Sequence, residues 1–295
     1  MPVLKRILAA TDFSPAGQRA VMRAGQLAQQ WDANLFLTHV RPDWNLFSRW
    51  RPAVPDSYQD VARCSDVPMR STLAELESRF RIHARCDSRL GKASSVITAI
   101  ANELEPHLVV IGARGEHEGT TPAPWLGGTA LKLLGRFQAP LLLVRRGADT
   151  AYSSSLVAVD VESPLARRAV LWGSGLIRAG DCHIVHAYDV PYIERMRLAG
   201  IEQSVLEQRI RLSEESAGSI ARELARAAEG EAKLHLRAVR GEPVTAILAE
   251  IERISPDIVV VGQRGPEALG DLRSPIGGVG FRIAYHAPTD VLVLA

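Results

Sequence analysis

The chain has 295 residues, with 35 basic and 33 acidic side chains and a formal net charge of +2. So small a basic excess argues against a protein that tracks double-stranded DNA, because phosphate binding needs concentrated positive charge. The cysteines Cys64, Cys86 and Cys182 form no CxxC pair, so they predict neither a disulfide framework nor a zinc finger. No apolar run approaches the ~20 residues that span a bilayer. The N-terminus also lacks the apolar core of a signal peptide, and we expect a cytoplasmic protein without membrane association.

The first half of the chain alternates short apolar runs with helical patterns. The first helix is predicted to begin at Ser14-Pro15, with serine as the N-cap and proline at the first helical position. Further helices are predicted at residues 93–104 and 127–137. Apolar runs and alternation predict strands at residues 3–10, 34–40, 82–90, 108–111 and 141–144.

The second half repeats this order of strands and helices. Its first helix is predicted to begin at Ser163-Pro164, and residues 192–229 form a long helix-forming stretch of mixed charge. Strands are predicted at residues 156–160, 182–187, 232–239, 258–261 and 291–294.

The two halves also share sequence. Leu108–Gly115 matches Ile258–Gly265, and Gly91, Gly127 and Gly128 each recur 150 positions later. Self-similarity at a fixed spacing indicates a repeat architecture. We therefore predict one ancestral domain that has been duplicated, with domains at residues 1–147 and 153–295.

Strict alternation of strands and helices predicts, in each half, a doubly wound parallel α/β sheet of five strands, covered by helices on both faces. In such sheets ligands bind beyond the carboxyl ends of the strands, where the strand order reverses. Conspicuous residues at these predicted ends are Thr11, Asp12, His39, Val40, Gly112, Arg114 and Gly115, and in the second half Asp160, His186, Ala187, Gly262, Arg264 and Gly265.

A glycine-rich motif follows the fourth predicted strand of each half. It reads Gly-x-Arg-Gly, then eleven residues (116–126 and 266–276), then Gly-Gly at the start of a helix. Glycines let backbone N–H groups approach a phosphate, a helix N-terminus favours anions, and Arg114 or Arg264 adds a charged contact. The motif predicts a phosphate cradle, with a tight turn kept only for folding as the alternative. It is neither a Walker A loop nor the dinucleotide fingerprint, which follows a first strand.

Several such motifs occur in the same order in both halves. They are Ala9–Ser14, Leu37–Val40, Val110–Gly115, Trp125–Gly128 and Ala139–Val144, followed by Ala158–Asp160, Val260–Gly265, Ile276–Gly278 and His286–Leu294. In this order the sequence resembles the universal stress protein family in its tandem form, over nearly the whole chain. The resemblance implies two Rossmann-like domains of the adenine nucleotide alpha hydrolase-like type. It also implies an internal pseudo-dimer through strands 140–145 and 290–294, with a homodimer as a further expectation.

Many members of that family bind ATP, with Mg²⁺, through Gly-x2-Gly-x9-Gly-[Ser/Thr]. Here the second spacer is longer, and Gly128 and Gly278 stand at the hydroxyl position. The missing hydroxyl removes roughly 0.5–1.5 kcal/mol of phosphate binding. The resemblance thus implies that ATP binding is weakened in both halves, and that the first half binds ATP more strongly than the second. The residues implied to contact nucleotide are Thr11, Asp12, Val40, Gly112, Arg114, Gly115, Gly127, Gly128 and Thr129, then Asp160, Ala187, Gly262, Arg264, Gly265, Gly277 and Gly278.

Some of these polar residues can also have a purely structural role. Asp12 and Asp160 can instead cap a helix or hold a loop. His39 and His186 can be strand-end histidines that hydrogen-bond to their neighbours.

Two further sequence features allow more than one interpretation. Cys182, His183 and His186 are close in sequence, but alternation along a strand points the first two to opposite faces, which argues against a metal site. Residues 41–70 interleave aromatic and arginine side chains. This pattern predicts either a segment that binds bases or a protein partner, or a loop that packs over the sheet.

We expect a non-catalytic stress-response protein in which a bound nucleotide orders the glycine loops and changes a surface for protein partners. No Ser-His-Asp or paired-carboxylate arrangement supports hydrolysis. A slow hydrolase would have to use Asp12, Glu116 or His117 as its base. The sequence is also compatible with a scaffold that binds no nucleotide and with a protein that binds a different, partly apolar ligand in the altered site.

Overall fold

The structure is a computed structural model that describes residues 4–42, 66–115, 126–134, 137, 139–160, 163–177, 179–190, 193–226, 231–262 and 278–295. The chain divides into two compact units, Val3–Thr150 and Ala151–Ala295. Most of the aromatic and arginine-rich segment, residues 43–65, lies outside the described residues.

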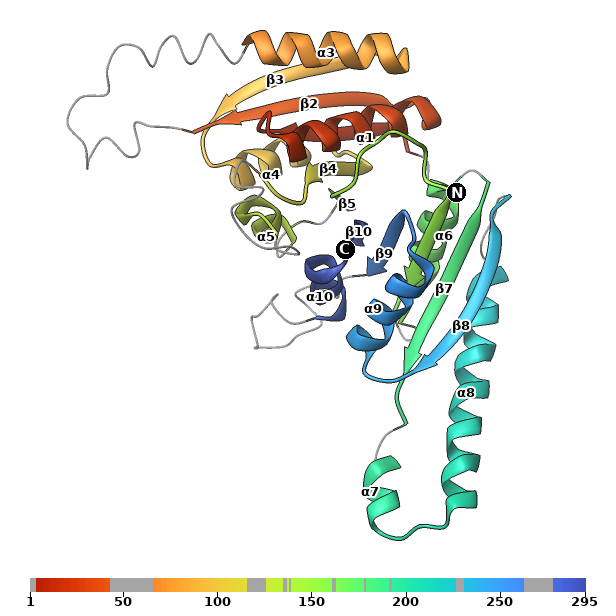
Figure 1. Cartoon of the computed structure of the whole chain (residues 1–295). Coiled ribbons are helices and arrows are strands. Elements are labelled where there is room, and N and C mark those ends of the chain that lie inside the picture. The colour runs from red at the N-terminus through yellow and green to blue at the C-terminus, as the bar shows by residue number, and fades with distance from the viewer. Residues whose placement is uncertain are drawn as a thin grey trace, which may run out of the picture. The chain divides into compact units, whose positions relative to one another are not determined.

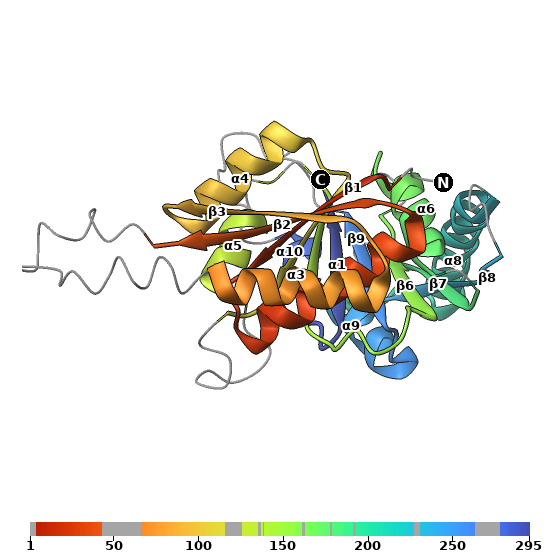
Figure 2. The ribbon, with the colours of Figure 1, turned by 90° about the horizontal axis from the view of Figure 1, so that it is seen from above.

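The first unit is a parallel five-stranded sheet with helices on both faces (Figure 1). The order of its strands is β3-β2-β1-β4-β5. Helices α1 and α3 lie side by side on one face, and α4 lies on the other (Figure 2). The elements are β1 (Arg6–Thr11), α1 (Pro15–Trp31), β2 (Asn34–Arg41), α3 (Asp66–Phe80), β3 (Ala84–Leu90), α4 (Ala93–Leu104), β4 (Leu108–Gly112), α5 (Gly128–Leu134) and β5 (Leu141–Val144).

The second unit repeats this architecture, with the strand order β8-β7-β6-β9-β10 and every described pairing parallel. Helices α6 and α8 pack together on one face of the sheet, while α9 and α10 pack together on the other. The elements are β6 (Ser154–Ala158), α6 (Ala166–Leu176), β7 (Asp181–Tyr188), α7 (Ile193–Leu198), α8 (Gln203–Arg226), β8 (Lys233–Arg240), α9 (Pro243–Ile254), β9 (Ile258–Gly262), α10 (Val279–His286) and β10 (Asp290–Leu294). The prediction of two Rossmann-like parallel sheets is confirmed.

The central strands form the core of each unit. The apolar residues of β4 and of β9 are at most 4% exposed, as expected for strands with helices on both faces. Helix α1 begins as predicted, because Ser14 Oγ accepts a hydrogen bond from the Gly17 N–H at 3.1 Å. This start fixes the loop between β1 and α1, which lies at the carboxyl end of the sheet.

The predicted start of the second unit's first helix is wrong. Ser163-Pro164 lies in a turn closed by the Ala166 N–H and the Ser163 carbonyl, at 3.0 Å, and α6 begins only at Ala166. The chain has one more residue between Asp160 and Ser163 than between Asp12 and Ser14. The extra residue displaces the serine from the N-cap position, so Leu165 precedes the helix without a side-chain cap.

The expected single helical stretch over residues 192–229 is divided in two. Helix α7 ends at Leu198, and Gly200 adopts a left-handed conformation with φ 74°. The Ile201 N–H then donates to the Met196 carbonyl at 3.1 Å, which is the bonding of a glycine C-cap. Helix α8 follows from Gln203.

Strand β6 begins and ends two residues earlier than predicted. Its start was missed because the first residues of the strand are polar. Ser155 is fully buried, and its hydroxyl donates to the Gly173 carbonyl at 2.9 Å. A search for apolar runs misses such a residue. Across the described part of the chain, we find no helix long and apolar enough to cross a membrane.

Candidate strand-end site

The order of strands reverses between β1 and β4 in the first unit, and the loops after these two strands meet at that point. The first loop carries Thr11 and Asp12, and the second carries Gly112, Arg114 and Gly115. A doubly wound sheet binds its ligands at this position. The structure therefore brings together two of the sequence-predicted groups, which are about 100 residues apart in the chain.

The Asp12 carboxylate is held in place by the start of α1. Its Oδ1 accepts hydrogen bonds from the Ser14 N–H at 3.0 Å and from the Ser14 hydroxyl at 2.5 Å. Phe13, between them, has a left-handed backbone with φ 61°, and its N–H donates to Thr11 Oγ1 at 2.9 Å. The structural role open to Asp12, holding a loop, is therefore present, and it fixes the carboxylate in one orientation.

Two glycines leave room for this carboxylate. A Cβ atom at Gly17 would lie 2.5 Å from Asp12 Oδ1, and one at Gly115 would lie 2.8 Å from Asp12 Oδ2. Asp12 thus lies between the first turn of α1 and the loop after β4. Any side chain at either glycine would have to displace the carboxylate.

Gly112 has a different role, because its neighbours are backbone atoms. A Cβ there would lie 2.9 Å from the Ala16 carbonyl carbon and oxygen and from the Arg114 carbonyl oxygen. The absence of a side chain lets the end of β4 approach the first turn of α1. Gly112 therefore serves the close packing that builds the site.

The second pair of glycines lies beside the same loop. The Gly127 N–H donates to the Ala113 carbonyl at 2.8 Å, and a Cβ at Gly127 would lie 3.4 Å from the Gly115 nitrogen. Gly128, the first residue of α5, is exposed, and a Cβ there would meet no atom within 4 Å. Thr129 follows in α5 and is half-buried. Five predicted residues, Asp12, Gly112, Gly115, Gly127 and Gly128, are thereby placed around the two loops.

The end of β2 adds the histidine of the neighbouring loop. His39 Nδ1 lies 2.8 Å from the Thr11 carbonyl oxygen, and the His39 ring contacts the Phe13 ring with centroids 4.5 Å apart. This is the strand-end histidine bonded to its neighbours, one of the two interpretations open from the sequence. Val40 is half-buried and pairs with Arg89 of β3.

The corresponding position in the second unit is arranged differently. A Cβ at Gly262 would lie 3.4 Å from both Cβ and Cδ1 of Leu165, so the Leu165 side chain lies over the end of β9. A Cβ at Gly280 would lie 2.5 Å from the Gly262 carbonyl oxygen. Apolar side-chain atoms therefore occupy space that, in the first unit, faces the α1 backbone.

The remaining predicted residues of the second unit are only partly described. Asp160 and Gly278 are exposed, Ala187 is half-buried, and His186 Nδ1 lies 3.0 Å from the Val159 carbonyl oxygen. The predicted contacts of Arg264, Gly265 and Gly277 lie outside the described residues. Glu116 and His117 also lie outside them.

The Cys182, His183 and His186 group is dispersed. Burial raises the pKa of the Cys182 thiol, and His183 stacks on His235 of β8 with centroids 4.7 Å apart. His235 in turn lies 2.6 Å from Asp181 Oδ1. In the part of the chain that the structure describes, no three histidine, cysteine, aspartate or glutamate side chains are grouped to hold a metal ion.

The part played by Gly17 is not predicted from the strand-end motifs. A signal was present, since glycine in the first turns of a helix costs roughly 1 kcal/mol relative to alanine and calls for a packing reason. The second half has Ala166 at the start of α6, so a comparison of the two halves would have singled out Gly17 as particular to the first.

Two solved structures share this architecture over nearly the full chain. One is a universal stress protein from Archaeoglobus fulgidus DSM 4304, with a TM-score of 0.68 and 18% identity, covering 98% of this chain and 97% of that one. The other is a functionally unknown protein from Pseudomonas aeruginosa PAO1, with a TM-score of 0.59, 15% identity and coverage of 99% and 92%. At such identities the similarity establishes the fold alone. No curated protein sequence matches the chain significantly.

The decisive comparison is with models of protein families. The model of the universal stress protein family matches the chain twice, over residues 4–145 and 152–295. The two matches together extend over almost the whole sequence and follow the repeated strand-end motifs. The chain therefore belongs to the universal stress protein family, in its tandem two-domain form.

Proposed function

We propose that the first unit binds an adenine nucleotide, ATP with Mg²⁺, at the strand-end site, and that the protein acts in the stress response as a non-catalytic sensor of that ligand. One observation carries the proposal. The Asp12 carboxylate is held by Ser14 between the loops after β1 and β4, where the strand order reverses. Gly17 and Gly115 leave the space that it occupies. Such an arrangement suits a polar ligand bound at the reversal of strand order.

Each group has a task in binding. Asp12 Oδ1 already accepts a hydrogen bond from the Ser14 hydroxyl. Oδ2 is turned toward Gly115 and is suited to accept a hydrogen bond from a nucleoside hydroxyl. Where the phosphates would lie, the backbone at Gly127 approaches the backbone at Gly115, and neither residue has a side chain. Backbone N–H groups can therefore approach a phosphate closely. Arg114 supplies a positive charge in that loop. The family resemblance points to the same residues.

The second unit is proposed to bind nucleotide more weakly. The Leu165 side chain lies over Gly262, and the Ser163 cap that would fix an aspartate before the helix is displaced into a turn. Both differences, the position of Leu165 and that of Ser163, lie in the second unit. A titration should therefore find one site of higher affinity per chain.

A sensor needs binding without turnover. Asp12, the described candidate for a general base, has one carboxylate oxygen occupied by two hydrogen bonds from Ser14. With Oδ1 bonded to Ser14 and Oδ2 proposed to bind the nucleoside hydroxyl, the carboxylate would have no oxygen left to take a proton from water. Binding would instead order the glycine loops and alter a surface for a protein partner.

Calorimetric titration with ATP and Mg²⁺ tests the proposal with a matched pair of glycine variants. In Gly115→Ala the new methyl group would lie 2.8 Å from Asp12 Oδ2, so the carboxylate must rotate away, and affinity should fall at least about tenfold. In Gly128→Ala the methyl group meets nothing within 4 Å, and affinity should stay close to that of the wild type. Circular dichroism should show both variants folded.

Gly128→Ser gives a gain-of-function test at the same position. The site has space for a side chain, and the family pattern has a hydroxyl there. One added hydrogen bond to phosphate should tighten ATP binding about two- to tenfold relative to Gly128→Ala.

Three results would contradict the proposed binding of nucleotide, and a fourth would contradict the non-catalytic role. The first is equal affinity in Gly115→Ala and Gly128→Ala, and the second is loss of binding only when Gly278 is changed. The third is the absence of heat at millimolar ATP, which would favour the scaffold that binds no nucleotide. Phosphate release by the wild type above a Gly127→Glu control would contradict the non-catalytic role and favour the slow hydrolase.

A further inference from the structure

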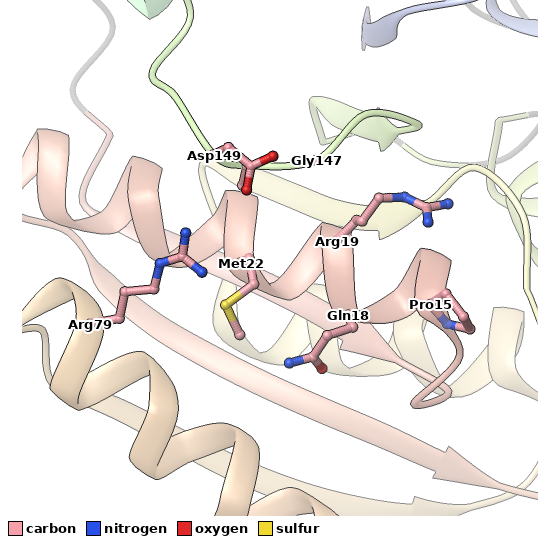
Figure 3. A pocket seen from close by; sticks show the side chains of 8 residues that line it. Pro15, Gln18, Arg19, Met22, Arg79, Gly147 and Asp149 are labelled. Atoms are coloured by element: carbon pink, nitrogen blue, oxygen red, sulfur yellow. The ribbon is translucent and has the colours of Figure 1, made fainter.

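A small pocket lies beside α1 in the first unit. It has a volume of about 310 Å³ and lies between α1, the last turn of α3 and residues 147–149 (Figure 3). Pro15, Gln18 and Met22 line it from α1, at the spacing of one helix face. Gly17, which contacts Asp12, points to the opposite side of the same helix. The two sites share a helix and no lining residue.

The segment that covers this pocket is held by a buried arginine. The Arg23 guanidinium donates to the Gly147 carbonyl at 2.7 Å and to the Thr150 carbonyl at 2.8 Å, and the residue is 4% exposed. Charged donors make the stronger class of hydrogen bonds. Residues 147–150 are therefore fixed against α1, and the pocket does not depend on a ligand to form it.

The lining carries charged side chains of both signs. Arg19 and Arg79 line the pocket together with one carboxylate, that of Asp149. A Cβ at Gly147 would lie 3.0 Å from Asp149 Oδ2, so this carboxylate turns back toward its own segment. Gln18, which also lines the pocket, donates to Glu75 Oε2 at 3.2 Å, so a second carboxylate lies beside the lining and the formal charges balance. The attraction for an anion therefore depends on where Arg79 lies.

Arg79 is the cation best placed to meet such a ligand. It belongs to the last turn of α3, and its guanidinium extends toward Met22 (Figure 3). Its guanidinium carbon lies 5.4 Å from the centre of the Phe80 ring, and among the described residues it forms no ion pair. An exposed guanidinium beside an apolar surface binds carboxylates well.

Part of the remaining wall is apolar. It includes Met22, which is 7% exposed, together with Pro15 and Ala148. The volume is at the lower end of the range for ligand pockets, which begins at about 300 Å³. Space of this size suits a short aliphatic chain with a charged end.

We propose that the pocket formed by Met22, Arg79 and residues 147–149 binds a small amphipathic monoanion, a short-chain aliphatic carboxylate. The carboxylate pairs with Arg79, and the aliphatic chain lies on Met22 and Pro15. This second ligand is distinct from the nucleotide, and its site is independent of it.

Methionine-methyl NMR tests this inference on the full chain. The protein has four methionines, so labelling the methyl groups with ¹³C gives a simple spectrum in which Met22→Leu identifies the Met22 signal. Hexanoate is the probe. It should shift the Met22 signal in a saturable way and leave those of Met69 and Met196 in place, whereas 1-hexanol, without the carboxylate, should not.

A matched pair of arginine variants on α3 completes the test. Arg79→Gln should weaken hexanoate binding at least about fivefold, while Arg70→Gln, which is exposed on the same helix and does not line the pocket, should leave it unchanged. The inference is overturned if Met22 does not respond, or if the two variants bind equally. It is also overturned if saturating ATP displaces hexanoate, because the pocket would then belong to the nucleotide site.

Discussion

At the scale of single residues, the site depends on one carboxylate and the glycines around it. Asp12 is oriented by Ser14, and its space is left open by Gly17 and Gly115. Asp160, its counterpart by sequence, is exposed and follows a strand that leads into a turn. Equivalent positions in the repeat therefore differ because their immediate neighbours differ.

Two histidines give the protein a predictable response to pH. Burial lowers the pKa of His183, and the charge of His235 acts in the same direction. Burial, followed by the charge of Arg6, lowers the pKa of His107. The Nδ1 atom of His107 accepts the Arg6 N–H at 3.1 Å, which it can do only when unprotonated.

The sign of the effect follows from proton linkage. Between the lowered pKa of each folded histidine and its unfolded value near 6.5, the unfolded chain binds more protons, so stability rises with pH. We expect the urea midpoint to be higher at about pH 7.5 than at about pH 5.5. Glu103, Asp181 and Glu242 have lowered pKa values and therefore lose their contribution only at more acid pH.

Substituting the two histidines shows how much of this pH dependence of stability they cause. In the double variant His107→Asn/His183→Asn, the difference between the two midpoints should be clearly smaller than in the wild type. An undiminished difference would show that other groups control the response.

At the scale of elements, similar sequences give different helix starts. Ser14-Pro15 caps α1, whereas Ser163-Pro164 lies in the turn before α6. The break between α7 and α8 was also marked in the sequence, by Gly200. Local patterns therefore predict where a helix can begin or end, while loop length decides which of these positions is used.

Arg23 connects α1 to the segment that ends the first unit, and its loss should be costly. Arg23→Met removes both bonds to the Gly147 and Thr150 carbonyls. Both hydrogen bonds are part-buried and have a charged donor, and a bond of this kind contributes about 1.5–3 kcal/mol, so we expect unfolding to become easier by roughly 2–4 kcal/mol. Trypsin should also cut faster after Arg145 or Arg146, beside the released segment.

Arg70→Met is the control for this prediction. Arg70 is exposed on α3 of the same unit, so the variant should match the wild type in both denaturation and proteolysis. If Arg23→Met behaved like Arg70→Met, the bonds from Arg23 would have no role in stability.

At the scale of the whole molecule, the chain is a duplicated domain. Both units have the same strand order, and the family model matches each of them. Domain limits at residues 1–147 and 153–295, and pairing of the halves through residues 140–145 and 290–294, stay predictions. So does the cytoplasmic location.

Expressing the units separately tests the predicted pairing. Residues 1–150 alone should fold, because they contain a complete five-stranded sheet. Strand β5 ends that sheet, and its residues Leu141–Val144 are strongly apolar. An apolar edge strand tends to pair with another copy, so light scattering should find the isolated unit dimeric. A monomer at all concentrations would argue against pairing through β5.

The repeat, the strands and the glycine motifs can all be predicted from the order of residues alone. Continuous apolar runs between helical patterns suffice for this, because burial on both faces of a parallel sheet imposes them locally. Asp12, Gly112 and Gly115 were singled out for the same reason, since they directly follow such runs.

Which of these residues meet, and how, depends on the folded arrangement of the elements. Asp12, in the loop after β1, lies against Gly115, in the loop after the neighbouring strand β4. Leu165 lies over Gly262, and Arg23 bonds to a carbonyl 127 positions away. The pocket beside Met22 likewise joins three separate segments of the first unit. Contacts of this kind depend on how the elements pack against one another, and the local pattern of apolar and polar residues does not specify that packing.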